Sequence, residues 1–171
     1  MFKEISVKDL SFNPFTSLQE DWALLSAKNG ENKVNSMTVS WGGVGAIFNE
    51  NVITVYVRPQ RYTRSFIDET GNISLSFFNG EYKKELAYLG AKSGKDEDKL
   101  SLQNFKPIFF GEFPAVDKAK LVICAKVIYK GEIFPQNFIK NNQVDYDKKW
   151  FPNKDYHYVY LAKIEKIYVS D

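Results

Sequence analysis

The chain has 171 residues, of which 44% are hydrophobic and 16% aromatic, and its formal net charge is +2 at pH 7. This length predicts a single domain over residues 1–171 with its own core, and the many Phe and Tyr residues favour strands, because flat rings pack well on a pleated sheet. The near balance of 23 basic and 21 acidic residues gives no basic face, which argues against nucleic acid as a partner.

The segment Met1–Ile5 lacks the basic and then apolar run of a signal peptide, and no apolar stretch approaches the ~20 residues of a spanning helix. The single cysteine, Cys124, lies in an apolar segment that is typical of a strand and can form no internal disulfide. We therefore expect a cytoplasmic protein without a membrane partner.

Alternation and turn residues predict the strands of the first half. Residues 22–27 and 52–57 are apolar runs bounded by turn-like residues, and residues 34–41 alternate from position 37 onward. Glycines in Gly42–Gly45 interrupt this pattern, and we expect a bend or bulge where the sheet curls. They also suggest a dinucleotide-binding loop, but the third glycine of that motif would fall at Phe48 and no helix pattern follows.

Residues 63–70 suit a short helix, with Thr63 as a candidate N-cap and Gly71 as the stop. The other expected elements are a strand over 73–78, a helix over 82–89, a loop over 90–94, a short helix over 96–102, and strands over 119–133 and 158–169. Residues 135–155 are polar, aromatic and irregular, which predicts a long surface excursion. The expected fold class is mainly β with a few helices.

All three arginines fall within seven residues, at positions 58, 61 and 64, and the rest of the chain uses lysine alone. Forked guanidinium donors match phosphate oxygens, and the cluster lies where a strand runs into a predicted helix N-terminus, which also favours an anion. The alternative is pairing with surface acids such as Asp68 or Glu69. For any single arginine that pairing is the preferred interpretation, but we favour a phosphate for Arg58 and Arg61 together, and we expect Arg64 to face solvent.

The strand at 34–41 carries short polar side chains, namely those of Asn35, Ser36, Thr38 and Ser40. Such groups can hydrogen-bond a flat polar heterocycle or a ribityl chain without filling its space. The alternative is an ordinary Ser/Thr-rich strand beside solvent, and for this strand alone that interpretation is preferred. Its position next to the arginine cluster shifts the balance toward a bound phosphorylated ligand.

Three segments in this order resemble the flavin reductase-like family: Asn35–Gly43, Val57–Thr63, and Gly90–Gly94 with Asp98 and Lys99. The similarity runs from about residue 21 to residue 102, and more weakly through the C-terminal strands. It implies an FMN-binding split β-barrel, usually a homodimer with the flavin near the subunit boundary. One departure is at position 36, where threonine is more usual, although serine keeps the hydroxyl.

By position, the resemblance implies three groups of cofactor-binding residues. The isoalloxazine and ribityl groups would be lined by Asn35, Ser36, Met37, Thr38, Val39, Ser40 and Trp41. The phosphate region would be surrounded by Arg58, Gln60, Arg61 and Thr63, with Tyr62 lying among them. Ser93, Gly94 and Lys99 would close over the cofactor.

The family implies an oxidoreductase that passes hydride or electrons from a reduced nicotinamide through FMN to a flavin, a metal or a protein. The alternatives are an electron carrier reduced by a protein partner and a non-catalytic FMN-binding module. Because FMN would carry the chemistry, no catalytic residue is expected. His157 is the only histidine, so with one cysteine no metal site is expected. We expect it to be packed, with contact to flavin or nicotinamide as the alternative.

Overall fold

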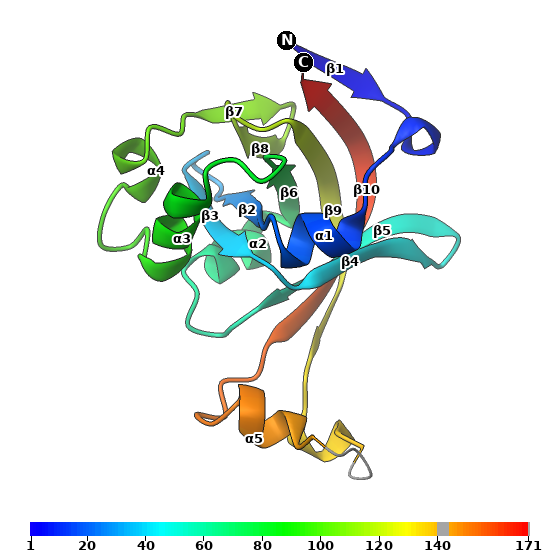
Figure 1. The fold of residues 1–171 in the computed structure, drawn as a ribbon, viewed down its shortest axis with the longest axis vertical. Helices are drawn as coiled ribbons and strands as arrows, with labels where there is room; N and C mark the ends of the chain where they lie inside the picture. The colour runs from blue at the N-terminus through cyan, green and yellow to red at the C-terminus, as the bar shows by residue number, and fades with distance from the viewer. Residues whose placement is uncertain (140–143, 171) are drawn as a thin grey trace.

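The structure is a computed structural model that describes residues 1–139 and 144–170. Its main feature is an eight-stranded antiparallel sheet with the order β3-β2-β6-β9-β10-β5-β4, to which β1 adds by pairing with β10. The strands of this sheet are β1 (Phe2–Ile5), β2 (Ala23–Lys28), β3 (Val34–Val39), β4 (Gly42–Ile47), β5 (Glu50–Val57), β6 (Asn72–Phe77), β9 (Leu121–Glu132) and β10 (Tyr158–Ser170). The sheet curls into a barrel, and the two termini lie side by side (Figure 1).

Smaller elements cover the barrel. A separate hairpin is formed by β7 (Pro107–Phe110) and β8 (Phe113–Val116). The helices are α1 (Pro14–Gln19), α2 (Thr63–Thr70), α3 (Lys83–Ala91), α4 (Lys99–Leu102) and α5 (Tyr146–Trp150), with 3-10 turns η1 (Val7–Asp9) and η2 (Pro135–Asn137). None of the helices in the described ranges is long and apolar enough to cross a membrane.

The barrel is not closed along β3. The two ends of the strand order, β3 and β4, follow one another in the chain through Ser40 and Trp41, yet in the described residues β3 pairs only with β2. Its other edge therefore presents unpaired backbone N–H and C=O groups. Such an open seam is where a sheet can hydrogen-bond a ligand instead of a strand.

Alternating side chains divide the core into two layers. Leu25, Met37 and Ile53 belong to the cluster inside the barrel. Leu24 and Leu86 belong to a second cluster, which α3, α4 and the β7–β8 hairpin cover. Because consecutive residues of a strand point to opposite faces, β2 contributes to both layers. Cys124, mid-strand in β9, is fully buried in the second layer, and burial raises the pKa of its thiol to about 12.

Most expected elements are confirmed, and two local interpretations are wrong. Gly42–Gly45 lies in β4, which pairs along its whole length with β5, so it forms a strand and no bend. A Cβ at Gly42 would lie 2.7 Å from the carbonyl oxygen of Thr54, so close strand approach requires glycine there. At α2 the N-cap is Tyr62 without a side-chain cap bond, while Gly71 ends the helix at φ 69°, as predicted.

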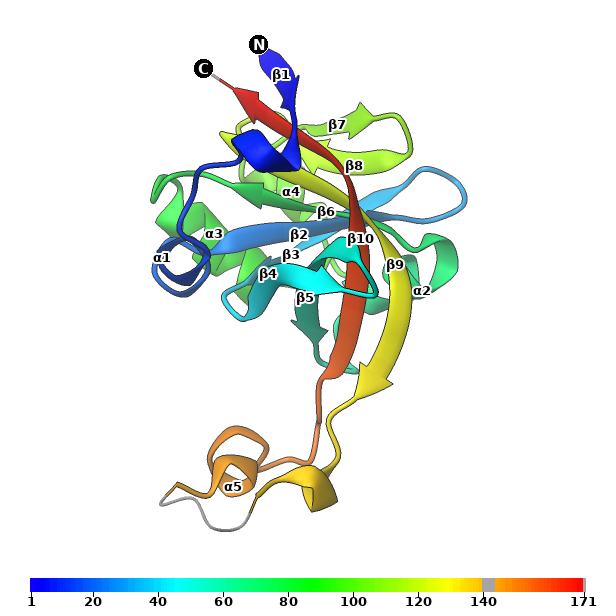
Figure 2. The same ribbon diagram turned by 90° about the vertical axis from the view of Figure 1, so that its right-hand side faces the viewer.

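The connection between β9 and β10 forms the expected excursion. It contains η2 and α5 and extends beyond the ends of these two long strands (Figure 2). Sequence patterns gave no sign of α5, which is five residues long and capped by Asp145. The excursion nevertheless meets the seam, because the rings of Trp150 and Trp41 lie 5.1 Å apart in an edge-on arrangement.

Candidate functional site

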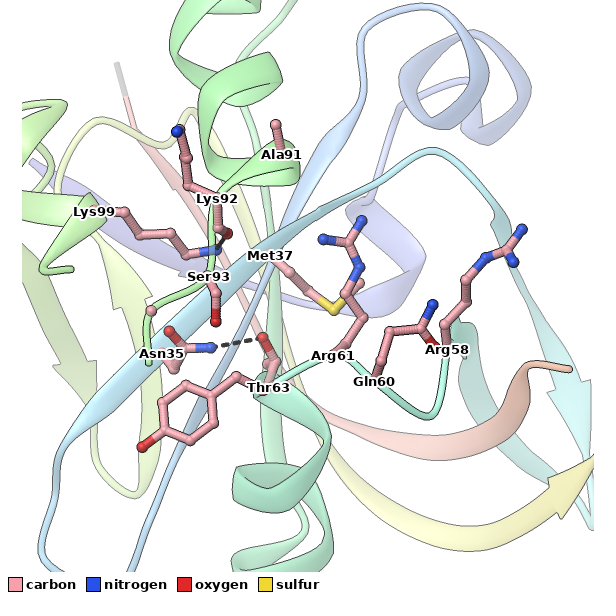
Figure 3. Close-up of a pocket in the computed structure, with 12 residues that line it drawn as sticks. Asn35, Met37, Arg58, Gln60, Arg61, Thr63, Ala91, Lys92, Ser93 and Lys99 are labelled. Carbon is pink, nitrogen blue, oxygen red and sulfur yellow. Dashed lines mark hydrogen bonds between the residues drawn. The ribbon is translucent and has the colours of Figure 1, made fainter. Parts of the chain in front are cut away.

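A cavity of about 240 Å³, which we call the polar cavity, lies between the start of β3, the approach to α2 and the loop after α3 (Figure 3). Its walls come from three segments that are far apart in the chain. It is lined by Asn35, Met37, Arg58, Gln60, Arg61, Tyr62, Thr63, Ala91, Lys92, Ser93, Gly94 and Lys99. The fold therefore brings together the three segments that carry the family resemblance.

The floor of the polar cavity is fixed by tight contacts. The amide of Asn35 donates a 2.8 Å hydrogen bond to the hydroxyl of Thr63, which ties β3 to the first turn of α2. A Cβ at Gly94 would lie 1.9 Å from Oδ1 of Asn35, so only glycine lets the loop approach β3 this closely. Thr63 and Asn35 are both buried. The backbone of this cavity is thus preorganised before any ligand arrives.

Three cations that line the polar cavity form no ion pair among the described residues: Arg61, Lys99 and the exposed Lys92. Arg61 is half-buried and donates to the carbonyl oxygen of Gly90, while Lys99 is 3% exposed and donates to the carbonyls of Leu89 and Lys92. Burial and the charge of Arg61 lower the pKa of Lys99 to about 8, and the opposing charge of Glu97 offsets this only in part.

Burial and the charge of Arg58 likewise lower the pKa of Arg61. Buried charges in folded proteins are normally paired with opposite charges. The cavity therefore has excess positive charge, and an anion such as a phosphate would satisfy it.

The other two arginines do have carboxylate partners. Arg58 forms an ion pair with Asp155, which also accepts a 2.8 Å hydrogen bond from the amide of Gln60. In Figure 3 the side chain of Arg58 extends away from Asn35 and Thr63. Arg64 pairs with Asp68 at 3.2 Å, the alternative considered for surface arginines. The three arginines are thus distinct, and Arg61 is the one without an acidic partner.

A second cavity of about 270 Å³, the Trp41 cavity, continues along the open seam of the barrel. It shares Met37, Arg58 and Arg61 with the polar cavity, so the two are contiguous. Its full lining is Met37, Thr38, Val39, Ser40, Trp41, Tyr56, Arg58, Arg61, Trp150 and His157. A ligand that spans both cavities would place an anionic group at Arg61 and a flat ring along the edge of β3.

The predicted row of hydroxyls is only partly available to a ligand. Ser36 is fully buried and its hydroxyl lies 2.7 Å from that of Ser26, so among the predicted site residues it alone lines neither cavity. The hydroxyl of Thr38 donates to the carbonyl of Leu86 in α3. Because β3 is an edge strand, its backbone is better placed than these hydroxyls to contact a ring.

His157 is a buried residue in the lining of the Trp41 cavity. Its ring packs near those of Trp41 (5.3 Å), Phe151 (5.5 Å) and Tyr56 (6.5 Å), and it is 7% exposed, as the packed interpretation expected. Burial, assisted by the charge of Arg58, lowers the pKa of its imidazole to about 4, so it is neutral at pH 7. Its Nδ1 atom is buried without a hydrogen-bond partner.

Sequence reasoning missed five lining or supporting residues: Tyr56, Ala91, Lys92, Trp150 and Asp155. Tyr56 could have been found, since it lies two residues before Arg58 on the same strand. Trp150 and Asp155 lie in the excursion, where no periodic pattern indicates which side chains return to the barrel. No group of three or more potential metal ligands occurs within the ranges that the structure covers.

No protein-family model and no curated protein matches the sequence. Solved structures match over most of the chain. Flavoredoxin from Methanosarcina acetivorans is 26% identical, with a TM-score of 0.65 over 88% of this chain and 69% of that one. An FMN-binding domain of a flavin reductases-like enzyme from Shewanella baltica OS155 is 13% identical, with a TM-score of 0.67 over 99% and 77%. The flavin reductase of styrene monooxygenase from Pseudomonas putida S12 is 14% identical, with a TM-score of 0.64 over 88% and 79%.

An antiparallel barrel that stays open along one strand, with a cationic cavity at the opening, defines this chain as a split β-barrel protein. Its structural neighbours are flavoredoxin and flavin reductase-like FMN-binding proteins of the same architecture. The resemblance of the three segments to the flavin reductase-like family is therefore confirmed.

Proposed function

We propose that this chain binds FMN across the two contiguous cavities and works as an oxidoreductase. The observation that carries the proposal is the pair of buried cations, Arg61 and Lys99, that form no ion pair among the described residues. A phosphate in the polar cavity would neutralise both. The naming of several structural neighbours as FMN-binding or flavin reductase proteins supports flavin as the ligand.

The residues of the polar cavity would then have distinct roles. The guanidinium of Arg61 and the ammonium of Lys99 would hold the phosphate, and Thr63 and Ser93 would add hydroxyl donors from two different segments. Asn35 and Gly94 set the width of the cavity. Arg58 and Gln60, held by Asp155, line the passage toward the Trp41 cavity.

The open edge of β3 would hold the isoalloxazine ring, with backbone groups of Met37–Trp41 available to hydrogen-bond its polar rim. Trp41, Tyr56 and His157 would exclude water from the ring. Bound FMN supplies hydride and electron transfer, so the protein needs only to position the ring and to control access. The proposed donor is a reduced nicotinamide, and the proposed acceptor is a flavin, a metal complex or a protein.

A flavoredoxin-type electron carrier, reduced by a protein partner, is the second candidate. This candidate is favoured by the similarity to flavoredoxin, whose sequence identity of 26% is the highest among the structures described above. A non-catalytic FMN-binding module is the third. All three share the same cofactor site and differ only in what reduces the flavin.

We also propose a homodimer, as the family resemblance implies. Exposed apolar side chains on the β4–β5 turn and on β9, those of Phe48, Ile128 and Tyr129, would be buried in it. Sedimentation equilibrium measures the mass directly. A strictly monomeric protein at micromolar concentrations would contradict this proposal.

The visible spectrum of the purified protein tests the proposed function. We expect flavin absorbance that is released as FMN on denaturation, and anaerobic bleaching on addition of NADH or NADPH. Bleaching by reduced ferredoxin alone would favour the electron carrier, and no bleaching by any donor would favour the binding module. A protein that fails to take up FMN on reconstitution would refute the proposal.

A further inference from the structure

A third cavity, which we call the aromatic cleft, opens beside the Trp41 cavity. Its walls come from α1, from the β3–β4 connection and β4, and from the excursion between β9 and β10. The residues that line it are Pro14, Phe15, Leu18, Gln19, Ser40, Trp41, Gly42, Gly43, Val44, Tyr56, Ile133, Phe138, Tyr146, Trp150 and Phe151. Its volume of about 770 Å³ falls in the range of small-molecule sites, which extends over roughly 300–1,000 Å³.

The chemistry of the aromatic cleft differs sharply from that of the polar cavity. Its described lining is rich in aromatic rings and contains no charged side chain, whereas the polar cavity contains Arg61 and Lys99. Polar groups are few and neutral, among them the Ser40 hydroxyl and the Gln19 amide.

Two cations lie over rings of the lining, Arg58 at 5.6 Å from Phe151 and Lys149 at 5.1 Å from Trp150, but neither lines the cleft and Arg58 is paired with Asp155. A carboxylate or phosphate in the cleft would therefore lose hydration with little counter-charge in return. An uncharged ring has no charge to desolvate, so it would not pay this cost of lost hydration.

The cleft adjoins the position proposed for the flavin ring. Ser40, Trp41, Tyr56 and Trp150 line both the aromatic cleft and the Trp41 cavity. The edge-on pair of Trp41 and Trp150, 5.1 Å apart at 88°, stands where the two cavities meet. The neighbouring imidazole of His157 is neutral at pH 7, so it adds no charge at this boundary.

We infer that the aromatic cleft is a second binding site, which takes an uncharged planar aromatic molecule and holds it next to the flavin ring. Only the position next to a flavin ring rests on the proposed function. The site itself rests on the lining, the volume and the absence of charge. Such a molecule would be placed within reach of electron exchange with bound FMN.

The other occupant to consider is a second copy of this chain. The cleft is open to solvent and lined by three separate segments, and its neutral aromatic lining suits stacked rings. The exposed apolar side chains that a dimer would bury also occur elsewhere, at Phe48 and Tyr129. We therefore favour the small molecule, and the experiment below separates the two.

Two glycines of β4 provide a matched pair of variants. Gly43 lines the cleft and Gly45 does not, yet both lie on the same strand face and a Cβ at either position meets no atom within 4 Å. Gly43→Leu should fill part of the cleft without disturbing the backbone. Gly45→Leu adds the same side chain outside the cleft, so it controls for effects on folding.

The probes are methyl 2-naphthyl ketone, which is neutral, and 2-naphthoate, which has the same ring system and a negative charge. Binding to the FMN-reconstituted protein is measured by calorimetric titration, and thermal unfolding checks the fold of both variants. We expect the ketone to bind and the naphthoate to bind about tenfold more weakly or worse. Gly43→Leu should weaken ketone binding about tenfold, and Gly45→Leu should change it less than about twofold.

Three results would overturn the inference: no ketone binding, equal binding of ketone and naphthoate, or equal affinities in the two leucine variants. Loss of a dimer in Gly43→Leu, seen by sedimentation without any ketone binding, would assign the cleft to a second copy instead. FMN retention is recorded separately by the visible spectrum. If the protein retained no flavin, the proposed function would fail, whereas the cleft would still be judged on ketone binding to the unloaded protein.

Discussion

Arg61 and Lys99 enter the polar cavity from opposite walls, and the positive charge of the first lowers the pKa of the second. Arg61 comes from the turn before α2 and Lys99 from the first residue of α4. Both side chains donate hydrogen bonds to backbone carbonyls of the chain around the cavity. Repulsion between the half-buried Arg61 and the buried Lys99 is unfavourable unless an anion binds between them. This relationship makes the proposed phosphate site testable.

Replacing Arg61 by alanine removes a forked phosphate contact. We expect FMN affinity to fall by about 1.5–3 kcal/mol, which corresponds to roughly ten- to hundredfold, while the fold survives. Fluorescence titration of the unloaded protein with FMN measures the change. Riboflavin, which lacks the phosphate, should bind the variant and the parent protein equally.

The other arginines are the matched controls. Arg58 is already paired with Asp155 and Arg64 with Asp68, so Arg58→Ala should cost less affinity than Arg61→Ala, and Arg64→Ala almost none. Equal losses for all three variants would indicate a general electrostatic effect and would count against a specific phosphate contact at Arg61.

Lys99 predicts a pH dependence with a defined sign. Its pKa is about 8 in the folded protein, against an ordinary value of 10.5. Between these two pH values the unfolded chain binds more protons than the folded chain, so the free energy of unfolding of the unloaded protein should rise with pH.

The affinity for FMN should change in the opposite direction. The proposed phosphate contact needs the charged ammonium of Lys99, so FMN affinity should fall as pH rises through about 8. Titrations at pH 7 and pH 9 measure this fall. Lys99→Met should bind more weakly and lose the pH dependence, and a slope that persists in it would exclude Lys99 as its source.

Gly94→Ala tests the close approach of the loop to β3. The added Cβ would lie 1.9 Å from Oδ1 of Asn35, so the loop or the amide must move. We expect destabilisation of about 1–3 kcal/mol together with weaker FMN binding. Gly45→Ala, where a Cβ meets no atom within 4 Å, is the control and should leave both properties unchanged. Denaturant unfolding and FMN titration give the two quantities.

His157 should make the free energy of unfolding depend on pH in the acidic range. Its pKa is about 4 in the folded protein and 6.5 ordinarily, so between these values the unfolded chain binds more protons and stability is lost as pH falls from about 6.5 toward 4. His157→Gln should flatten this part of the stability curve. Because the chain has one histidine, its imidazole proton signals in NMR report the pKa directly. A midpoint near 6.5 in the folded protein would contradict the buried neutral imidazole.

The residues of the polar cavity could largely be predicted from the sequence because the information that points to them is local. Three arginines in seven residues, a strand that runs into a helix and a glycine-containing loop are visible without any tertiary contact. The wrong interpretation of Gly42–Gly45 has a physical cause. Glycines that interrupt an apolar pattern are compatible both with a bend and with a strand that lies very close to its neighbour. Only the pairing of β4 with β5 distinguishes these two structures.

The sequence by itself determined the β-rich class and grouped Arg58, Arg61 and Thr63 into one candidate site, since both depend on residue type and short-range spacing. Only the tertiary structure decided which cation lacks an acid partner, because Asp155 reaches Arg58 across almost a hundred residues of chain. It also decided that the Ser36 hydroxyl faces Ser26 and that Trp150 returns to Trp41. Charge compensation and aromatic walls are long-range properties, and no local pattern encodes them.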